Sequence, residues 1–403
     1  MSCARKSRTG CPLTWPRLGL TVMLPTVQYV ERPGIVDLGW GHPDPDSLPV
    51  DEWGAATSAA LRRYRWQALT YGTAAGPGPL VEWLADRLSR IDARAPAASE
   101  LFITAGASHA LDLLSGLLVV PGDVVLVAAP TYHLALRIFA DRGAELRAAP
   151  ADGYGIRPDA TAELIQDLRR AGRRVALVYL VPTFGNPTGA CLPAERRAGL
   201  VELAARTGVT VVEDDTYREL SYTGTAPPSV WSRSAGEPVV RIGSFAKSVA
   251  PGLRLGWITG EPALVARLTG RGYVESGGCV NHTTACAMAE FGGSGGYDRH
   301  LSRVRELYRH RRDALRAAVR CHLGIEVAVP DGGWFLWVGL GAHVDSRRLL
   351  VAAERHGVSF LAGTTFFVDP DAGRHHARLA FSMLPAAVLA EGARRLGEAL
   401  AAS

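Results

Sequence analysis

Between about residues 100 and 245, short apolar runs alternate with segments of helical periodicity. The helical segments carry apolar residues at spacings of three and four, as at 80–88, 106–118 and 194–206. The apolar runs have the length of buried strands: 101–104, 124–128, 175–180, 209–212 and 239–242. Continuous apolar strands separated by amphipathic helices are typical of a mainly parallel sheet with helices on both faces. We therefore predict an α/β fold.

The pattern changes after about residue 265. A charged amphipathic helix is predicted over about 299–319, and strands at 332–338 and 378–381 precede a C-terminal helix. This arrangement predicts a second, smaller α/β domain. We predict a flexible extension over residues 1–25 and a segment over 26–55 that joins the small domain. A large domain is predicted over 56–270 and the small domain over 271–403.

Composition narrows the class of protein. The 403 residues are 47% hydrophobic and 21% charged, which is ordinary for a globular chain of two domains. The formal net charge is +5, but the basic residues are dispersed and not interleaved with aromatic residues, so no nucleic-acid partner is expected. The six cysteines form no C-x-x-C pair, which predicts no metal site and a reducing, cytoplasmic location. No segment has the length of a membrane span, so no membrane partner is expected.

One lysine stands out because the chain has only two, Lys6 and Lys247. A lysine amine forms an imine with a carbonyl group, which an arginine side chain does not. Most lysines lie on the surface, but small and apolar residues flank Lys247. Ser244 and Arg254 stand close by in sequence, and a hydroxyl and a guanidinium suit a phosphate dianion. This pattern indicates a site for a cofactor that carries a carbonyl group and a phosphate.

Two other motifs follow apolar strands. Asp214 ends such a strand, where ligands bind in parallel α/β sheets, and a carboxylate there can keep a pyridine nitrogen protonated. Tyr217 is three residues further on and can reach a ring oxygen. Asn186 lies in a loop with two prolines, 182–189, and its amide can donate to a phenolate. Taken alone, the acidic residues could instead cap a helix, and the loop could be an ordinary connection.

In this order, the three segments resemble those of fold-type I enzymes that depend on pyridoxal 5'-phosphate (PLP), in the aspartate aminotransferase superfamily. The resemblance covers roughly residues 35–400. It is strongest to the branch that contains aminoadipate and kynurenine aminotransferases and the effector domains of MocR-type regulators. It implies a large domain with a mainly parallel sheet between helices, a smaller α/β domain, and PLP as the cofactor.

The resemblance also implies roles for individual residues. Lys247 would hold PLP as a Schiff base (an aldimine), Asp214 would pair with the pyridine nitrogen, and Tyr217 and Asn186 would donate to the ring oxygen. Gly106, Ala107 and Ser108 would form the phosphate-binding turn, and Ser244 and Arg254 would be phosphate ligands. Tyr132 would stack on the pyridine ring, and Tyr71 would reach the phosphate of a neighbouring subunit. The substrate would be bound through its carboxylate by Arg378 and otherwise by Asn186, Gly41 and Trp40. The role of Tyr71 implies a homodimer with shared active sites.

The reaction that the resemblance implies is transamination from an amino acid to a 2-oxo acid. The same scaffold supports β-elimination with C–S lysis, decarboxylation and oxidative deamination, and these alternatives stay open, as does the side chain of the substrate. A ligand-sensing domain of a MocR-type regulator is a further alternative. Fewer than about 40 residues precede the resemblance, too few for a winged helix, so we expect an enzyme. Gly185, Ala246 and Val81 depart from the glutamine, serine and arginine common in this branch.

Overall fold

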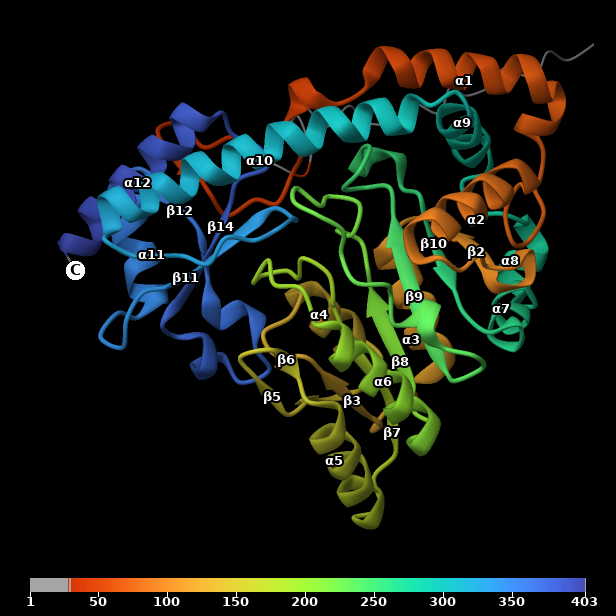
Figure 1. The fold of residues 1–403 in the computed structure, drawn as a ribbon, viewed down its shortest axis with the longest axis horizontal. Helices are drawn as coiled ribbons and strands as arrows, with labels where there is room; N and C mark the ends of the chain where they lie inside the picture. The colour runs from red at the N-terminus through yellow and green to blue at the C-terminus, as the bar shows by residue number, and fades with distance from the viewer. Residues whose placement is uncertain (1–27, 29, 403) are drawn as a thin grey trace, which may run out of the picture. The chain divides into compact units, whose positions relative to one another are not determined.

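The computed structural model describes Gln28 and residues 30–402, so the predicted extension over 1–25 lies outside the described residues. A seven-stranded sheet organises the chain from Gly34 onward (Figure 1). In spatial order its strands are β2 (Leu101–Thr104), β10 (Gly256–Thr259), β9 (Val239–Ser244), β8 (Thr210–Asp214), β7 (Val175–Leu180), β3 (Val124–Val127) and β4 (Glu145–Ala148). Six strands run parallel and β10 runs antiparallel to both of its neighbours. The predicted α/β fold with a mainly parallel sheet is confirmed.

Helices cover both faces of this sheet, which explains its continuous apolar strands. Successive residues of β3 point to opposite faces. Val125 and Val127 pack with residues of α3 and α4, whereas Val124 and Leu126 pack with residues of α5 and α6. The bounds of the helices are α1 (Val50–Tyr64), α2 (Gly78–Asp92), α3 (Ala107–Leu118), α4 (His133–Ala140), α5 (Pro158–Arg170), α6 (Ala194–Thr207), α7 (Pro262–Thr269), α8 (Gly272–Gly277), α9 (His282–Gly293), α10 (Gly296–Leu323), α11 (Ser346–Arg355) and α12 (Ala386–Ala401).

Strand β10 was missed in the sequence pattern because it is four residues long and begins with a glycine. The strand fits between β2 and β9 through close contacts at small residues. A Cβ atom on Gly243 would lie 2.0 Å from the indole of Trp257, so only glycine leaves room for this ring. The antiparallel strand therefore depends on a pairing of distant residues that periodicity does not reveal.

A second sheet lies in the C-terminal part of the chain. It has three antiparallel strands, β11 (Phe335–Gly339), β14 (His376–Ala380) and β13 (Leu361–Ala362). Short pairs form elsewhere: parallel β1 (Val36–Asp37) with β12 (Val358–Ser359), and antiparallel β5 (Ala151–Asp152) with β6 (Gly155–Ile156). The predicted strand at 332–338 thus begins three residues later, and the predicted helix over 299–319 is longer, as α10.

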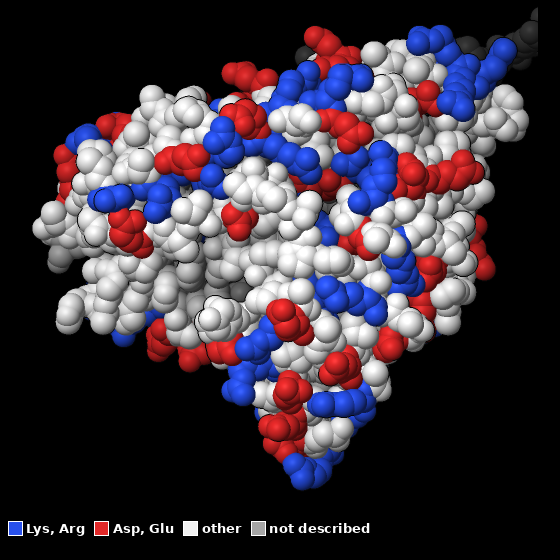
Figure 2. Space-filling model, in the orientation of Figure 1, with Lys and Arg blue, Asp and Glu red and all other residues white. Residues whose placement is uncertain are grey.

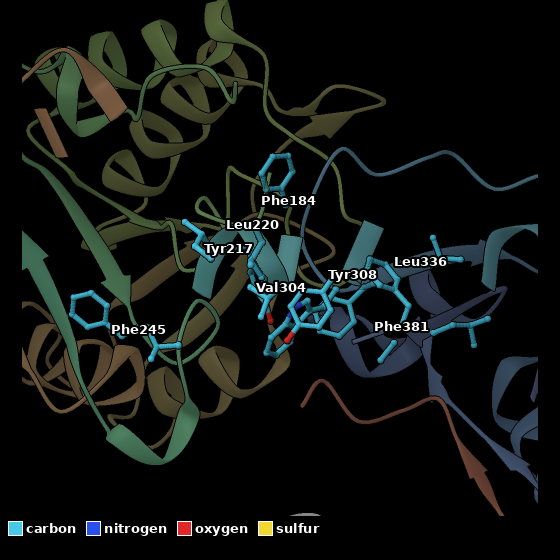
Figure 3. Close-up of a cluster of buried hydrophobic side chains, with 14 of the residues drawn as sticks. Phe184, Tyr217, Leu220, Phe245, Val304, Tyr308, Leu336 and Phe381 are labelled. Atoms are coloured by element: carbon cyan, nitrogen blue, oxygen red, sulfur yellow. The ribbon is translucent and has the colours of Figure 1, made fainter. Parts of the chain in front are cut away.

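The segment after β1 runs beside β14, which brings residues soon after Gly34 to the C-terminal sheet. The N–H of Ala380 donates to the carbonyl oxygen of Leu38 over 2.7 Å. A large apolar cluster lies under this sheet, and Figure 3 shows part of it, with Tyr217, Tyr308 and Leu336 among the labelled side chains. The division of the chain into a large and a small domain at residue 270 stays a prediction.

Candidate active site

The carboxyl ends of β8 and β9 place three of the predicted site residues. Asp214 is the last residue of β8, and Ser244 is the last residue of the neighbouring strand β9. Lys247 follows three residues after Ser244. Because parallel strands present their carboxyl ends at one edge of the sheet, the lysine and the carboxylate face the same region.

The carboxylate of Asp214 is buried and held by hydrogen bonds from the side chain of Tyr179 and from the backbone and side chain of Thr216. The hydroxyl of Tyr179 donates to Oδ2 over 3.0 Å, and the N–H of Thr216 donates to Oδ1 over 3.3 Å. Burial raises the pKa of Asp214, and the hydrogen bonds from Thr216 and Tyr179 act in the opposite direction. Sequence reasoning missed Tyr179. The available signal was a phenol within an otherwise aliphatic strand.

The amine of Lys247 lies over aromatic rings. Its Nζ is 4.6 Å from the ring centroid of Trp334 and 5.9 Å from that of Tyr217. Burial and then the positive charge of Arg378 lower the pKa of Lys247 to about 8, against an attraction to Asp214. A lysine with a pKa this low has a sizeable neutral fraction near neutral pH, which is what a nucleophile or a general base needs.

A place for an anion lies where α3 begins. Gly106 precedes this helix with a φ of 89°, and a Cβ there would lie 2.9 Å from the guanidinium of Arg254. Arg254 donates to the carbonyl oxygen of Ala105 over 3.1 Å, so its charge stays at the N-terminus of α3. Free N–H groups, the helix dipole and a guanidinium together favour a phosphate. Ala107 and Ser108 lie in the first turn of this helix, and their role in binding a phosphate stays a prediction.

Arg378 lies on β14 and is buried among aromatic rings. Its guanidinium carbon is 4.1 Å from the ring centroid of Phe335 and 5.1 Å from that of Phe366. Two of its nitrogens donate, to the side-chain oxygen of Asn186 over 2.9 Å and to the carbonyl oxygen of Gly39. Its Nε has no partner among the described residues. Burial lowers the pKa of Arg378 to about 10, which still leaves it a cation at neutral pH.

The remaining predicted residues are placed in different ways. Tyr132 precedes α4, and burial and then the charge of Asp214 raise its pKa to about 12, so the two side chains are near each other. Gly41 packs on Phe335, where a Cβ would lie 2.8 Å from the ring, and Trp40 contacts His42 edge to face. Tyr71 is 81% exposed and therefore does not pack into the site of its own chain.

The sequence predicts no metal, nucleic-acid or membrane partner, and the described residues bear on each of these expectations. Within residues 30–402 no group of three or more His, Cys, Asp or Glu side chains is arranged to hold a metal ion. On the face drawn in Figure 2, basic and acidic side chains are interspersed. No helix of the described part of the chain combines the length and the apolar character needed to cross a membrane.

A half-buried lysine near a buried carboxylate, with an anion site and a buried arginine, on an α/β fold of this topology, defines the class of PLP-dependent fold-type I enzymes. The family model for aminotransferase class I and II matches residues 33–396, and the chain belongs to this family.

Similar proteins agree with this assignment. The aromatic-amino-acid aminotransferase 1 of Thermococcus litoralis is 33% identical, with 93% of this chain and 90% of that protein covered. The 2-aminoadipate transaminase of Thermus thermophilus is 31% identical over 96% of this chain and 98% of its own length. The crystal structure of the kynurenine aminotransferase of Pyrococcus horikoshii, in complex with PMP, has a TM-score of 0.85, 31% identity and coverage of 92% and 91%. The predicted resemblance, the PLP cofactor and an aminotransferase activity on amino acids are thus confirmed.

The residues present fit this cofactor. Gly106 and Arg254 form a cradle that a Cβ atom would fill, as a phosphate requires. Asp214 is a buried carboxylate that can accept from a ring nitrogen, and Lys247 is an amine that can bond to an aldehyde carbon.

Proposed function

We propose that the group around Lys247 is the active site of this aminotransferase, with Lys247 as the residue that binds PLP. The observation that carries this proposal is the convergence of unlike charges on one half-buried amine. The pKa of Lys247 responds, after burial, to Arg378, Asp214 and Arg254, which come from three separate parts of the chain. Each of these residues matches a different part of the reactants: the substrate carboxylate, the ring nitrogen and the phosphate.

Each residue then has a defined task. PLP, when bound, supplies a ring that accepts electrons from the substrate Cα. Asp214 holds a proton on the ring nitrogen, which keeps the ring electron-poor. Arg378 binds the substrate carboxylate in a planar, charge-assisted contact and so orients the bond between Cα and hydrogen. Nζ of Lys247 takes the proton of the substrate Cα as a general base and then donates a proton to the cofactor.

Two supporting residues complete the proposed contacts. Tyr217 follows Asp214 by three residues and is buried, and burial raises the pKa of Tyr217, so its phenol keeps a hydrogen to donate to the ring oxygen. Asn186 uses its side-chain oxygen toward Arg378, which leaves its NH2 group to donate to the same ring oxygen.

We further propose that the enzyme acts as a homodimer. Trp66, Leu69 and Tyr71 are 71%, 71% and 81% exposed, and so many large apolar side chains within six residues favour contact with another protein surface. Tyr71 would then reach the phosphate site of its neighbour. A cytoplasmic location is the matching proposal, since the four described cysteines are all free.

An amino-acid panel with the purified holoenzyme tests the site and its reaction together. Aromatic amino acids, 2-aminoadipate and kynurenine come first because the names of relatives point to them. The cofactor's visible absorption, 2-oxo acids and ammonia are followed in parallel. We expect a 2-oxo acid and pyridoxamine phosphate without ammonia. Ammonia in amounts equal to the 2-oxo acid would contradict transamination and favour elimination or oxidation.

A further inference from the structure

Tyr179 lies beneath the proposed site without reaching its surface. It belongs to β7, where it pairs with Val127 of β3 and Val212 of β8. Because side chains alternate along a strand, Val212 and Asp214 share one face of the sheet, and the hydroxyl of Tyr179 meets Asp214 on that face. The side chain of Tyr179 is 0% exposed. Its role must therefore be exerted through neighbouring residues.

The ring of Tyr179 is held in place by packing. It contacts Phe139 of α4 edge to face, with the ring centroids 5.4 Å apart, and it belongs to the same apolar cluster as Val127 and Val212. This packing fixes the direction of the hydroxyl. The hydroxyl donates to Oδ2 of Asp214 over 3.0 Å, so the bond joins a rigid donor to a carboxylate at the sheet edge.

The bond leaves the carboxylate of Asp214 free to accept once more. Each carboxylate oxygen has two lone pairs, and three of these four are taken by the hydroxyl of Tyr179 and by the N–H and the side chain of Thr216. Burial raises the pKa of Tyr179 well above its ordinary value, and the charge of Asp214 adds to this effect, so the phenol stays protonated and acts only as a donor here. Protonation of Asp214 would remove the charge, whereas a hydroxyl donor stabilises the ionised form.

We propose that Tyr179 is a positioning residue that keeps Asp214 ionised and aimed at the ring nitrogen of the cofactor. The proposal rests on the role assigned to Asp214 above. Tyr179 does not touch the reactants. It acts through the hydrogen bond from its hydroxyl to Oδ2 of Asp214, alongside the hydrogen bonds that Thr216 supplies to the same carboxylate.

The test compares binding of two cofactors to the apoenzyme, PLP and its 1-deaza analogue, in which a C–H group replaces the ring nitrogen. Tyr179→Phe removes the hydroxyl and keeps the ring. We expect this variant to bind PLP about tenfold more weakly, as for the loss of a hydrogen bond to a charged group, and to lose clearly less affinity for the deaza analogue. An equal loss for both cofactors would show a merely structural role and overturn the proposal.

Tyr222→Phe is the matched control. Tyr222 is also a largely buried phenol, but its hydroxyl donates to the carbonyl oxygen of Gly333. We expect the ratio of the two dissociation constants to be unchanged in this variant.

If Tyr179→Phe does not fold, 3-fluorotyrosine at position 179 keeps the ring and makes the hydroxyl a stronger donor, so the preference for PLP should increase. A preference that stays constant would also overturn the proposal.

Asp214→Asn separates failure of this inference from failure of the proposed site. If Asp214→Asn reduces the preference for PLP over the deaza analogue and Tyr179→Phe does not, Asp214 keeps its role and Tyr179 loses its own. If Asp214→Asn leaves the preference at the wild-type value, the role of Asp214 in the proposed site is wrong.

Discussion

The guanidinium of Arg378 donates a hydrogen bond over 2.9 Å to the side-chain oxygen of Asn186, 192 positions earlier in the chain. Arg378 lies on β14 of the second sheet, whereas Asn186 follows β7 of the central sheet. The bond fixes the planes of both side chains. It therefore couples the proposed ligand of the substrate carboxylate to the proposed donor to the cofactor's ring oxygen.

Substitution of Arg378 tests the carboxylate contact. Arg378→Lys keeps a positive charge but loses the planar pair of donors and the bond to Asn186. We expect kcat/KM for an amino acid to fall on the order of a hundredfold, as for a buried charged hydrogen bond. Turnover of an amine that lacks a carboxylate should change little. Arg374→Lys is the control, since Arg374 forms a partly exposed ion pair with Asp345. A drop of equal size for the amine would contradict the assignment.

Sequence patterns could locate the parts of the site that follow strands. Lys247, Asp214 and Gly106 each stand beside an apolar run, so their place at the sheet edge follows from periodicity. The bond between Arg378 and Asn186 could not be predicted this way, because nothing local links two residues so far apart. Tyr179 was missed for another reason: a phenol in an otherwise aliphatic strand was the available signal, but the sequence does not show which group its hydroxyl contacts.

The scarcity of lysine makes the attachment site easy to identify. Reduction of the holoenzyme with borohydride should fix the cofactor to Lys247, and peptide mass spectrometry shows which of the two lysines carries it. Lys247→Arg should lose the visible absorption of the bound cofactor together with activity, because a guanidinium does not form the imine. Lys6→Arg should keep both. Label on Lys6, or visible absorption in Lys247→Arg, would refute the assignment.

The low pKa of Lys247 predicts a pH dependence of cofactor capture. Only the neutral amine attacks the aldehyde, so the rate at which the apoenzyme binds PLP covalently should rise with pH and level off above about 8. In Arg378→Met the repulsion from a neighbouring cation is gone, so the pKa of Lys247 and the midpoint should both move upward. Stopped-flow absorbance between pH 6.5 and 9.5 measures both midpoints. A wild-type rate that still rises without levelling off at pH 9.5, as expected for the ordinary lysine pKa of 10.5, would contradict this prediction.

A buried ionic network stands directly beside the site residue Asp214. Arg241 contacts Asp92 over 2.6 Å and Asp215 over 2.8 Å, and Arg218 contacts the same two carboxylates. In Arg241→Met one arginine is left for two buried carboxylates. We expect the free energy of unfolding to fall by about 3–5 kcal/mol, measured by urea denaturation of the apoenzyme at pH 7.

The same network predicts how this loss depends on pH. Burial opposes ionisation of Asp215, but the charges of Arg241 and Arg218 bring its pKa below the ordinary value of 3.8. A depressed pKa contributes stability above the unfolded value, and this stability is lost as the pH falls through the folded one. The difference between wild type and Arg241→Met should therefore shrink below about pH 4. Arg170→Met removes an exposed ion pair with Asp167 and should change stability by less than about 1 kcal/mol. A loss in Arg241→Met no larger than in this control would mean that the buried charges do not depend on Arg241.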